Sequence, residues 1–135
     1  MAVNLVNPSG LPEIPIYKQV SVATGSRIVH IAGQVAWDEN GADVGVGDFA
    51  AQVEQCYLNV GKALDGVGAT FDDVVKLTMH VVDWKPDMMP LLLDGIARAA
   101  EKLGVTPAAP ASMFGIVTLD VPEHLVEVEA VAVLD

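Results

Sequence analysis

The end of the chain carries the pattern that most restricts its fold. Residues 125–133 place valine or alanine at every even position, while the odd positions include two glutamates. A period of two residues is typical of a β-strand that buries one face and presents the other to water or protein. Residues 110–119 are also largely apolar. The sequence therefore predicts two closing strands joined by a turn at residues 120–124.

The beginning of the chain predicts two more strands. Residues 17–23 alternate between polar and apolar side chains, and residues 27–36 form a second apolar run after a short Gly-containing turn. Two such runs separated by a turn are typical of a β-hairpin. Residues 1–15 contain three prolines, so this segment is expected to be extended or turning rather than regular.

Two segments between these strands have apolar residues at helical spacing. The first follows Asp48, whose carboxylate can accept the exposed N–H groups of a helix start, and it ends near Gly66. The second spans residues 88–103, and the β-branched residues 74–82 between them indicate a strand. This order predicts an α+β fold in which one mixed sheet carries both helices on one face.

The two faces of the predicted sheet differ in character. On one face, the strand at 74–82 and the last strand present apolar side chains that are expected to meet the helices: Val75, Leu77, Met79, Val81, Val126, Val128, Ala130 and Ala132. The other face carries mostly polar side chains: His30, Gln34, Lys76, Thr78, His80, Glu127 and Glu129. Such a mixed face fits either a solvated surface or a surface that packs against another subunit, with polar groups lining the clefts.

Composition excludes several classes of function. The net charge of −11 disfavours nucleic acid and anionic membranes as partners, because both need an excess of Lys and Arg. The single cysteine, Cys56, excludes an internal disulfide, and His30 and His124 lack partners at metal-ligand spacing, so no metal site is expected. No signal peptide or membrane-spanning run is recognisable. We expect a single domain over residues 1–135 in the cytoplasm.

Five segments of the chain resemble one known family. Residues 15–19 (Pro-Ile-Tyr-Lys-Gln) resemble its G-P-Y-x-Q segment, and residues 31–34 (Ile-Ala-Gly-Gln) resemble its S-G-Q segment. The first predicted helix matches the family helix in character, residues 74–83 resemble its V-K-x-T-V-x-V-x-D strand, and residues 126–133 resemble its closing V-E-I-E-A-I-A-V strand. In this order and spacing, they resemble the Rid family, also called the YjgF/YER057c/UK114 family.

The resemblance implies a fold, an assembly and an activity. The fold is chorismate-mutase-like α+β, and the assembly is a homotrimeric barrel with sheets inside, helices outside and a cleft at each subunit interface. The best-known members hydrolyse reactive enamines and imines derived from amino acids, releasing a 2-oxo acid and ammonia without a metal or organic cofactor. The implied partners are therefore a small-molecule ligand and two further copies of the chain.

The resemblance also assigns candidate site residues. Glu127 falls on the family glutamate that positions or activates water, and Tyr17 falls on a tyrosine near the cleft mouth, so these two are the predicted catalytic residues. Gly33 falls on a glycine whose backbone borders the pocket, and Ala32 replaces a common serine. The predicted substrate-binding residues are Ala32, Gly33, His80, Leu91, Ala111, Ser112 and Met113.

One residue of the family pattern is missing. In the best-known members an arginine near the start of the penultimate strand binds the substrate carboxylate, because a guanidinium presents paired donors that match a carboxylate. Its expected position here is Ala111, or Ala108 or Ser112 in a shifted register, and the chain has arginine only at positions 27 and 98. Deamination of 2-imino acids by the usual binding mode is therefore not expected, and the apolar residues nearby favour a more apolar ligand.

Several functions remain open at this point. The leading hypothesis is a hydrolase, or another acid–base enzyme, acting on an imine, an enamine or a related carbonyl compound. His80 is either an acid or base near neutral pH or a histidine satisfied at an interface. Glu127 and Glu129, on one side of a strand, permit paired-carboxylate chemistry or are simply half exposed to water. The alternatives are a non-catalytic module that binds a ligand or a protein, and a pathway-specific enzyme of secondary metabolism.

Overall fold

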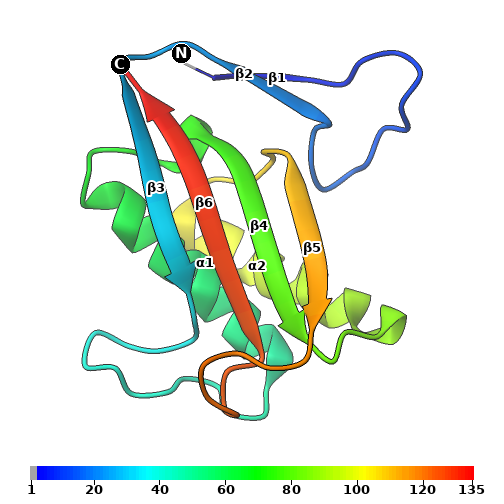
Figure 1. Cartoon of the computed structure of the whole chain (residues 1–135), viewed down its shortest axis with the longest axis vertical. Coiled ribbons are helices and arrows are strands. Elements are labelled where there is room, and N and C mark those ends of the chain that lie inside the picture. The colour runs from blue at the N-terminus through cyan, green and yellow to red at the C-terminus, as the bar shows by residue number, and fades with distance from the viewer. Residues whose placement is uncertain (1–2) are drawn as a thin grey trace.

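The strands form two sheets rather than the single predicted sheet. The computed structural model describes residues 3–135. A four-stranded mixed sheet has the order β3-β6-β4-β5, with β4 and β5 parallel and the other neighbours antiparallel. A separate antiparallel pair, β1 and β2, lies across one end of it (Figure 1). The strands are β1 (Val3–Val6), β2 (Val20–Ala23), β3 (Arg27–Gln34), β4 (Val74–Val82), β5 (Ala111–Ile116) and β6 (Val126–Leu134).

Both helices cover the same face of the four-stranded sheet, as predicted (Figure 1). Helix α1 (Phe49–Asp65) begins at Asp48, whose carboxylate accepts a hydrogen bond from the Ala51 N–H at 3.0 Å. Helix α2 (Met89–Leu103) ends at Gly104, which has a positive φ of 70°. Short 3₁₀ turns, Phe71–Asp73 and Pro86–Met88, precede β4 and α2. The predicted α+β fold with two helices and a mixed sheet is therefore confirmed.

The predicted N-terminal hairpin is wrong. Strand β2 pairs with β1, in a segment that we expected to be extended or turning, while β3 pairs with β6. The physical reason is that alternation predicts a strand without naming its partner. Val29 and Ile31 of β3 pack against the core beneath the helices, so β3 joins the main sheet, whereas β2 has no such face.

The two closing strands are not neighbours either. Strand β4 lies between them, parallel to β5 and antiparallel to β6. The connection over residues 117–125 crosses the end of β4 (Figure 1), where the Val82 N–H donates to the Leu125 carbonyl and the Asp83 N–H to the Ile116 carbonyl. The predicted turn at 120–124 therefore lies within a longer connection between two strands that β4 separates.

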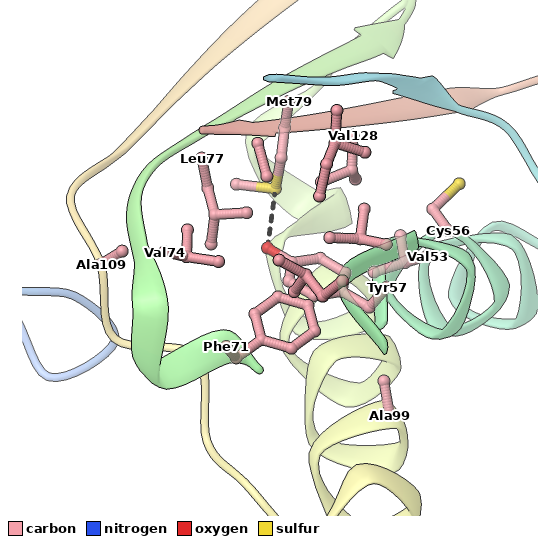
Figure 2. Packing of buried hydrophobic residues seen from close by; sticks show 14 of the residues in the cluster. Val53, Cys56, Tyr57, Phe71, Val74, Leu77, Met79, Ala99, Ala109 and Val128 are labelled. Atoms are coloured by element: carbon pink, nitrogen blue, oxygen red, sulfur yellow. Dashed lines mark hydrogen bonds between the residues drawn. The ribbon is translucent and has the colours of Figure 1, made fainter. Parts of the chain in front are cut away.

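The helix-covered face contains the core. On β6, Val126, Val128 and Ala132 are 0% exposed, which confirms the predicted apolar side of this strand. Figure 2 shows the cluster, in which the Tyr57 hydroxyl donates to the Met79 sulfur at 3.5 Å. The helices approach closely at Gly95, where a Cβ would lie 2.6 Å from the Ala50 carbonyl oxygen. Glycine at this position therefore lets α1 and α2 pack as one layer over the sheet.

Simple alternation fails at two irregular places. The β4–β6 register shifts between Val74 and Lys76, so Val74 is buried and Val75, predicted to face the helices, is only partly buried. The Val75 carbonyl instead accepts a hydrogen bond from Ser21 Oγ at 2.7 Å. The β3–β6 register also shifts between Ile31 and Gln34. Gln34 therefore pairs with Val128 of the covered face, although it was predicted to lie on the same face as His30.

Candidate functional site

The face of the sheet opposite the helices, here called the open face, holds an acid beside a histidine. Glu127 of β6 and His80 of β4 are register partners, and His80 Nδ1 lies 4.0 Å from Glu127 Oε1. Their side chains are 29% and 27% exposed, respectively. His80 Nδ1 is buried and has no hydrogen-bond partner within residues 3–135. The pair is thus partly shielded from water but reachable by a small ligand.

The backbone of β3 lies close to the Glu127 carboxylate. A Cβ at Gly33 would lie 2.3 Å from Glu127 Cδ, closer than real Cβ contacts come. Gly33 also lies within the register shift between Ile31 and Gln34, which takes Ala32 and Gly33 out of the regular ladder. Glycine here therefore lets the main chain approach the carboxylate closely.

Strand β5 adds an aromatic ring and a hydroxyl to the open face. Phe114, the register partner of His80, stacks on its ring at a centroid distance of 5.9 Å and an interplanar angle of 22°. Ser112, the partner of Thr78, accepts a hydrogen bond from Lys76 Nζ at 2.7 Å. Next to these residues, a hollow in the same face is lined by His30, Ile31, Ala32, Lys76, Thr78, Glu129, Ala130 and Val131.

The other predicted residues of β5 face the opposite way. Ala111 and Met113 pair with Leu77 and Met79 and point toward the helices. With Tyr17 they line a cavity of about 210 Å³. Its remaining walls are apolar apart from the Tyr57 hydroxyl and are formed by Ile16, Tyr57, Leu77, Met79, Met89, Leu92, Ile96, Pro107 and Ala109.

A single chain therefore does not bring all the predicted site residues together. Glu127, His80 and Ser112 lie on the open face, with Ala32 and Gly33 beside them. Tyr17, Ala111 and Met113 lie at the cavity on the helix side. Leu91 is 47% exposed on α2, whereas its neighbours Met89 and Leu92 line that cavity. The candidate site consists of two half-sites on opposite faces of the sheet.

Sequence reasoning missed two side-chain arrangements. It placed Lys76 on the open face but gave it no role, because its bond to Ser112 depends on the parallel pairing of β4 with β5. It also gave no role to His124, which is 3% exposed and lies between Asp120, at 2.6 Å, and Asp43, at 2.8 Å. His124 joins two loops rather than lining either half-site.

Ionisation of the buried groups does not suggest further catalytic residues. Burial, and secondarily the charge of Glu127, raises the pKa of the Cys56 thiol, so this fully buried cysteine stays protonated. Burial likewise raises the pKa of Tyr57. Residues 3–135 contain no group of three or more His, Cys, Asp or Glu side chains arranged to hold a metal ion. Across the same residues, no helix is both long and apolar enough to cross a membrane.

Comparisons with solved structures agree with the fold. A protein of unknown function from Yersinia pestis, the Rid family protein YyfB, is 37% identical to this chain. It superposes with a TM-score of 0.86 over 99% of this chain and 100% of that one. The YjgF gene product of E. coli is 22% identical and has a TM-score of 0.66 over 96% of this chain and 98% of its own. The second likeness supports the fold alone.

Sequence comparisons identify the family. The 3-aminoacrylate deaminase RutC of Acinetobacter baylyi is 30% identical over 84 residues, which are 62% of this chain and 66% of that protein. The match thus spans just under two thirds of that relative's length. The family model described as Endoribonuclease L-PSP matches residues 11–134. The chain therefore belongs to the Rid family, also known as YjgF/YER057c/UK114 or L-PSP.

Proposed function

We propose that this protein hydrolyses a small imine, enamine or related carbonyl compound by acid–base chemistry on the open face of the sheet. The observation that carries the proposal is the position of Glu127, which lies against the backbone at Gly33 and 4.0 Å from His80 Nδ1. A carboxylate beside an imidazole is suited to moving protons to and from water. The similarity to a 3-aminoacrylate deaminase supports an enamine as substrate.

The proposed reaction uses Glu127 to activate water. The carboxylate accepts a proton as the water oxygen bonds to the imine carbon, and the C=N electron pair moves to the nitrogen, which takes up a proton. The hydroxyl group of this adduct then gives up its proton to the acid–base pair and the nitrogen takes up one proton from it, so that the carbon–nitrogen bond breaks, ammonia leaves, and a carbonyl product forms. An enamine enters the same sequence after protonation at carbon. His80 and Glu127 are the groups placed to carry these protons.

We further propose that the working unit is a homotrimer with a ligand cleft at each interface. Glu127 and Met113 face opposite sides of the sheet, so one cleft can contain both only if two copies contribute. Exposed apolar side chains at the sheet also favour assembly: Ile28 is 68% exposed and Phe114 is 53% exposed. Tyr17 and the apolar cavity wall would then close the cleft over the open face of a neighbour.

RNA cleavage, which the family description mentions, is disfavoured for this chain. Its net charge is −11, and binding to RNA relies on Lys and Arg contacts with phosphates. A non-catalytic ligand-binding module remains the second candidate, because Ala111 stands where the best-known members have an arginine. For either function, we expect the protein to act in the cytoplasm on a small molecule.

The test is ammonia release from freshly generated 2-aminoacrylate. We expect the protein to accelerate it, and we expect Glu127→Ala to abolish the acceleration. Glu39→Ala is the matched control, since Glu39 lies exposed in the loop after β3. Unchanged activity in Glu127→Ala would refute the catalytic assignment. Absence of any acceleration by the unmodified protein, with several imines and enamines, would favour the binding module.

A further inference from the structure

Lys76 differs from the other cationic side chains of this protein. The chain has 7 Lys and Arg residues, and Lys76 is the one that is partly buried, on the open face of β4. The others are exposed: Lys18, Arg27, Lys62, Lys85, Arg98 and Lys102. Arg98 and Lys102 form ion pairs with Asp94 and Glu54. Lys76 is therefore the cation whose surroundings need an explanation.

Lys76 has no carboxylate partner in the part of the chain that the structure describes. No Asp or Glu oxygen among residues 3–135 lies within 4.0 Å of its nitrogen, although the chain has 18 acidic residues. Its one hydrogen bond within the described residues is to Ser112 Oγ at 2.7 Å. An ammonium group has three N–H donors, so donors remain free for a ligand. A partly buried cation without a counter-ion is unfavourable, and binding an anion relieves that cost.

The Lys76 nitrogen lies a short distance along the sheet from the acid–base pair of His80 and Glu127. Ser112 is the register partner of Thr78, so the nitrogen that it holds lies near the level of Thr78. His80 and Glu127 are one pair further along, about 7 Å along the strand. A ligand of a few atoms spans that gap if its carboxylate meets Lys76 and its reacting carbon meets the water held by Glu127.

The hollow beside Lys76 restricts the charge of such a ligand. Glu129 and Thr78 line the hollow together with Lys76, and Glu129 is the register partner of Thr78. A carboxylate at Lys76 and a protonated nitrogen toward Glu129 would each meet an opposite charge. A ligand with two anionic groups would be repelled by Glu129. The hollow thus suits a small compound that carries one carboxylate and one imine or enamine nitrogen.

We propose that Lys76, positioned by Ser112, binds the carboxylate of the substrate in this chain, which has no arginine at Ala111. The substrate class is then a short carboxylate-bearing imine or enamine rather than a purely apolar one. This inference rests on the proposed function. A lysine offers a point charge rather than a bidentate fork, so it fixes the orientation of the carboxylate less tightly. Glu127 and His80 then position the reacting carbon.

The test is direct binding of 2-oxobutanoate, a carboxylate product mimic, measured by calorimetry and by chemical-shift titration. We expect the unmodified protein to bind 2-oxobutanoate and to discriminate against its uncharged amide. Lys76→Met should weaken binding by about 10- to 100-fold, the usual loss for a charge-assisted contact. Lys76→Arg should retain most of the affinity, and Lys62→Met, an exposed lysine of α1, should match the unmodified protein.

The outcomes separate this inference from the proposed function. Equal binding by Lys76→Met and the unmodified protein would overturn the inference, as would a failure of the unmodified protein to bind 2-oxobutanoate. Loss of assembly in Lys76→Met, without any carboxylate binding by the unmodified protein, would show that the lysine pairs with a neighbouring copy. Lys76-dependent binding without ammonia release would refute the hydrolase and leave the carboxylate site standing.

Discussion

The side chains of strand β6 alternate between two faces of the sheet, and the two faces have different requirements. Val126 and Val128 are 0% exposed beneath the helices, whereas the side chain of Glu127 between them is 29% exposed on the open face. The covered face meets one requirement, the exclusion of water, which many apolar side chains satisfy. The open face depends on particular groups at particular distances. Substitutions on the two faces should therefore separate stability from activity.

The largest expected effect is on the open face. Glu127→Gln keeps the size of the side chain but removes its ability to accept a proton. We expect kcat for ammonia release to fall by about 10²- to 10⁴-fold, the usual contribution of a general base. The melting temperature should change little, because the side chain is 29% exposed on the open face and keeps its size in the variant. Steady-state kinetics and thermal unfolding of the same sample check both halves of the prediction.

Gly33→Ala should have the next largest effect. The new Cβ would lie 2.3 Å from Glu127 Cδ, and the flexible glutamate side chain is what gives way. A displacement of about 1 Å lowers the rate by about 10²-fold, while stability changes little. Gly61→Ala is the control, since the atoms nearest to its Cβ would belong to the flexible Leu103 side chain on the helix side. Equal activity in the two variants would show that the position of the carboxylate is unimportant.

The covered face should respond in the opposite sense. Val128→Ala, next to Glu127 in sequence, removes two buried methyl groups and should lower the free energy of unfolding by about 2 to 3 kcal/mol. The kcat of the protein that remains folded should stay near that of the unmodified protein. Urea denaturation and kinetics below the transition measure the two quantities. A loss of activity without loss of stability would contradict the division between the faces.

The smallest effect is a pH dependence of stability away from both half-sites. Burial lowers the pKa of His124, but hydrogen bonds to Asp120 and Asp43 outweigh it, so this pKa is raised above its ordinary 6.5. The stabilisation is therefore fully present below about pH 6.5 and is lost as the pH rises through the folded-state pKa. His124→Gln should reduce the decrease in unfolding free energy that occurs as the pH rises above about 6.5.

The same prediction includes the hydrogen-bond partner Asp120 and a control variant at His30. The hydrogen bond to His124 is the main cause of a lowered pKa at Asp120, so the contribution of Asp120 is lost only as the pH falls below its ordinary 3.8. His30→Gln should leave the pH dependence of the unmodified protein in place, because His30 is exposed on β3. An identical pH dependence in His124→Gln would contradict the role given to His124.

Periodicity predicted most of the elements but not their partners. The helices at 49–65 and 89–103 and the strand at 74–82 follow the predicted ranges within a residue or two, because each buries a side or stripe of apolar residues. The pairing of β1 with β2, and the place of β4 between β5 and β6, depend on contacts between distant segments. No local pattern encodes those contacts, so the predicted N-terminal hairpin was wrong.

The candidate site could be predicted only in part for the same reason. Alternation along β4 and β6 put His80 and Glu127 on one face, and the register pairs them. The bond between Lys76 and Ser112 requires the parallel pairing of β4 and β5 and could not be read from either strand. Val75 and Gln34 were misplaced because a register shift changes the side on which the following residues lie.

The central claim is that one cleft combines the open face of one copy with the helix-side half-site of another. The mass of the protein in solution, measured by light scattering after size-exclusion chromatography, tests it most directly. The chain has a mass of 14.2 kDa, so a trimer is predicted to have three times 14.2 kDa, or about 43 kDa. A species of 14.2 kDa at working concentrations, with ammonia-releasing activity intact, would contradict the claim.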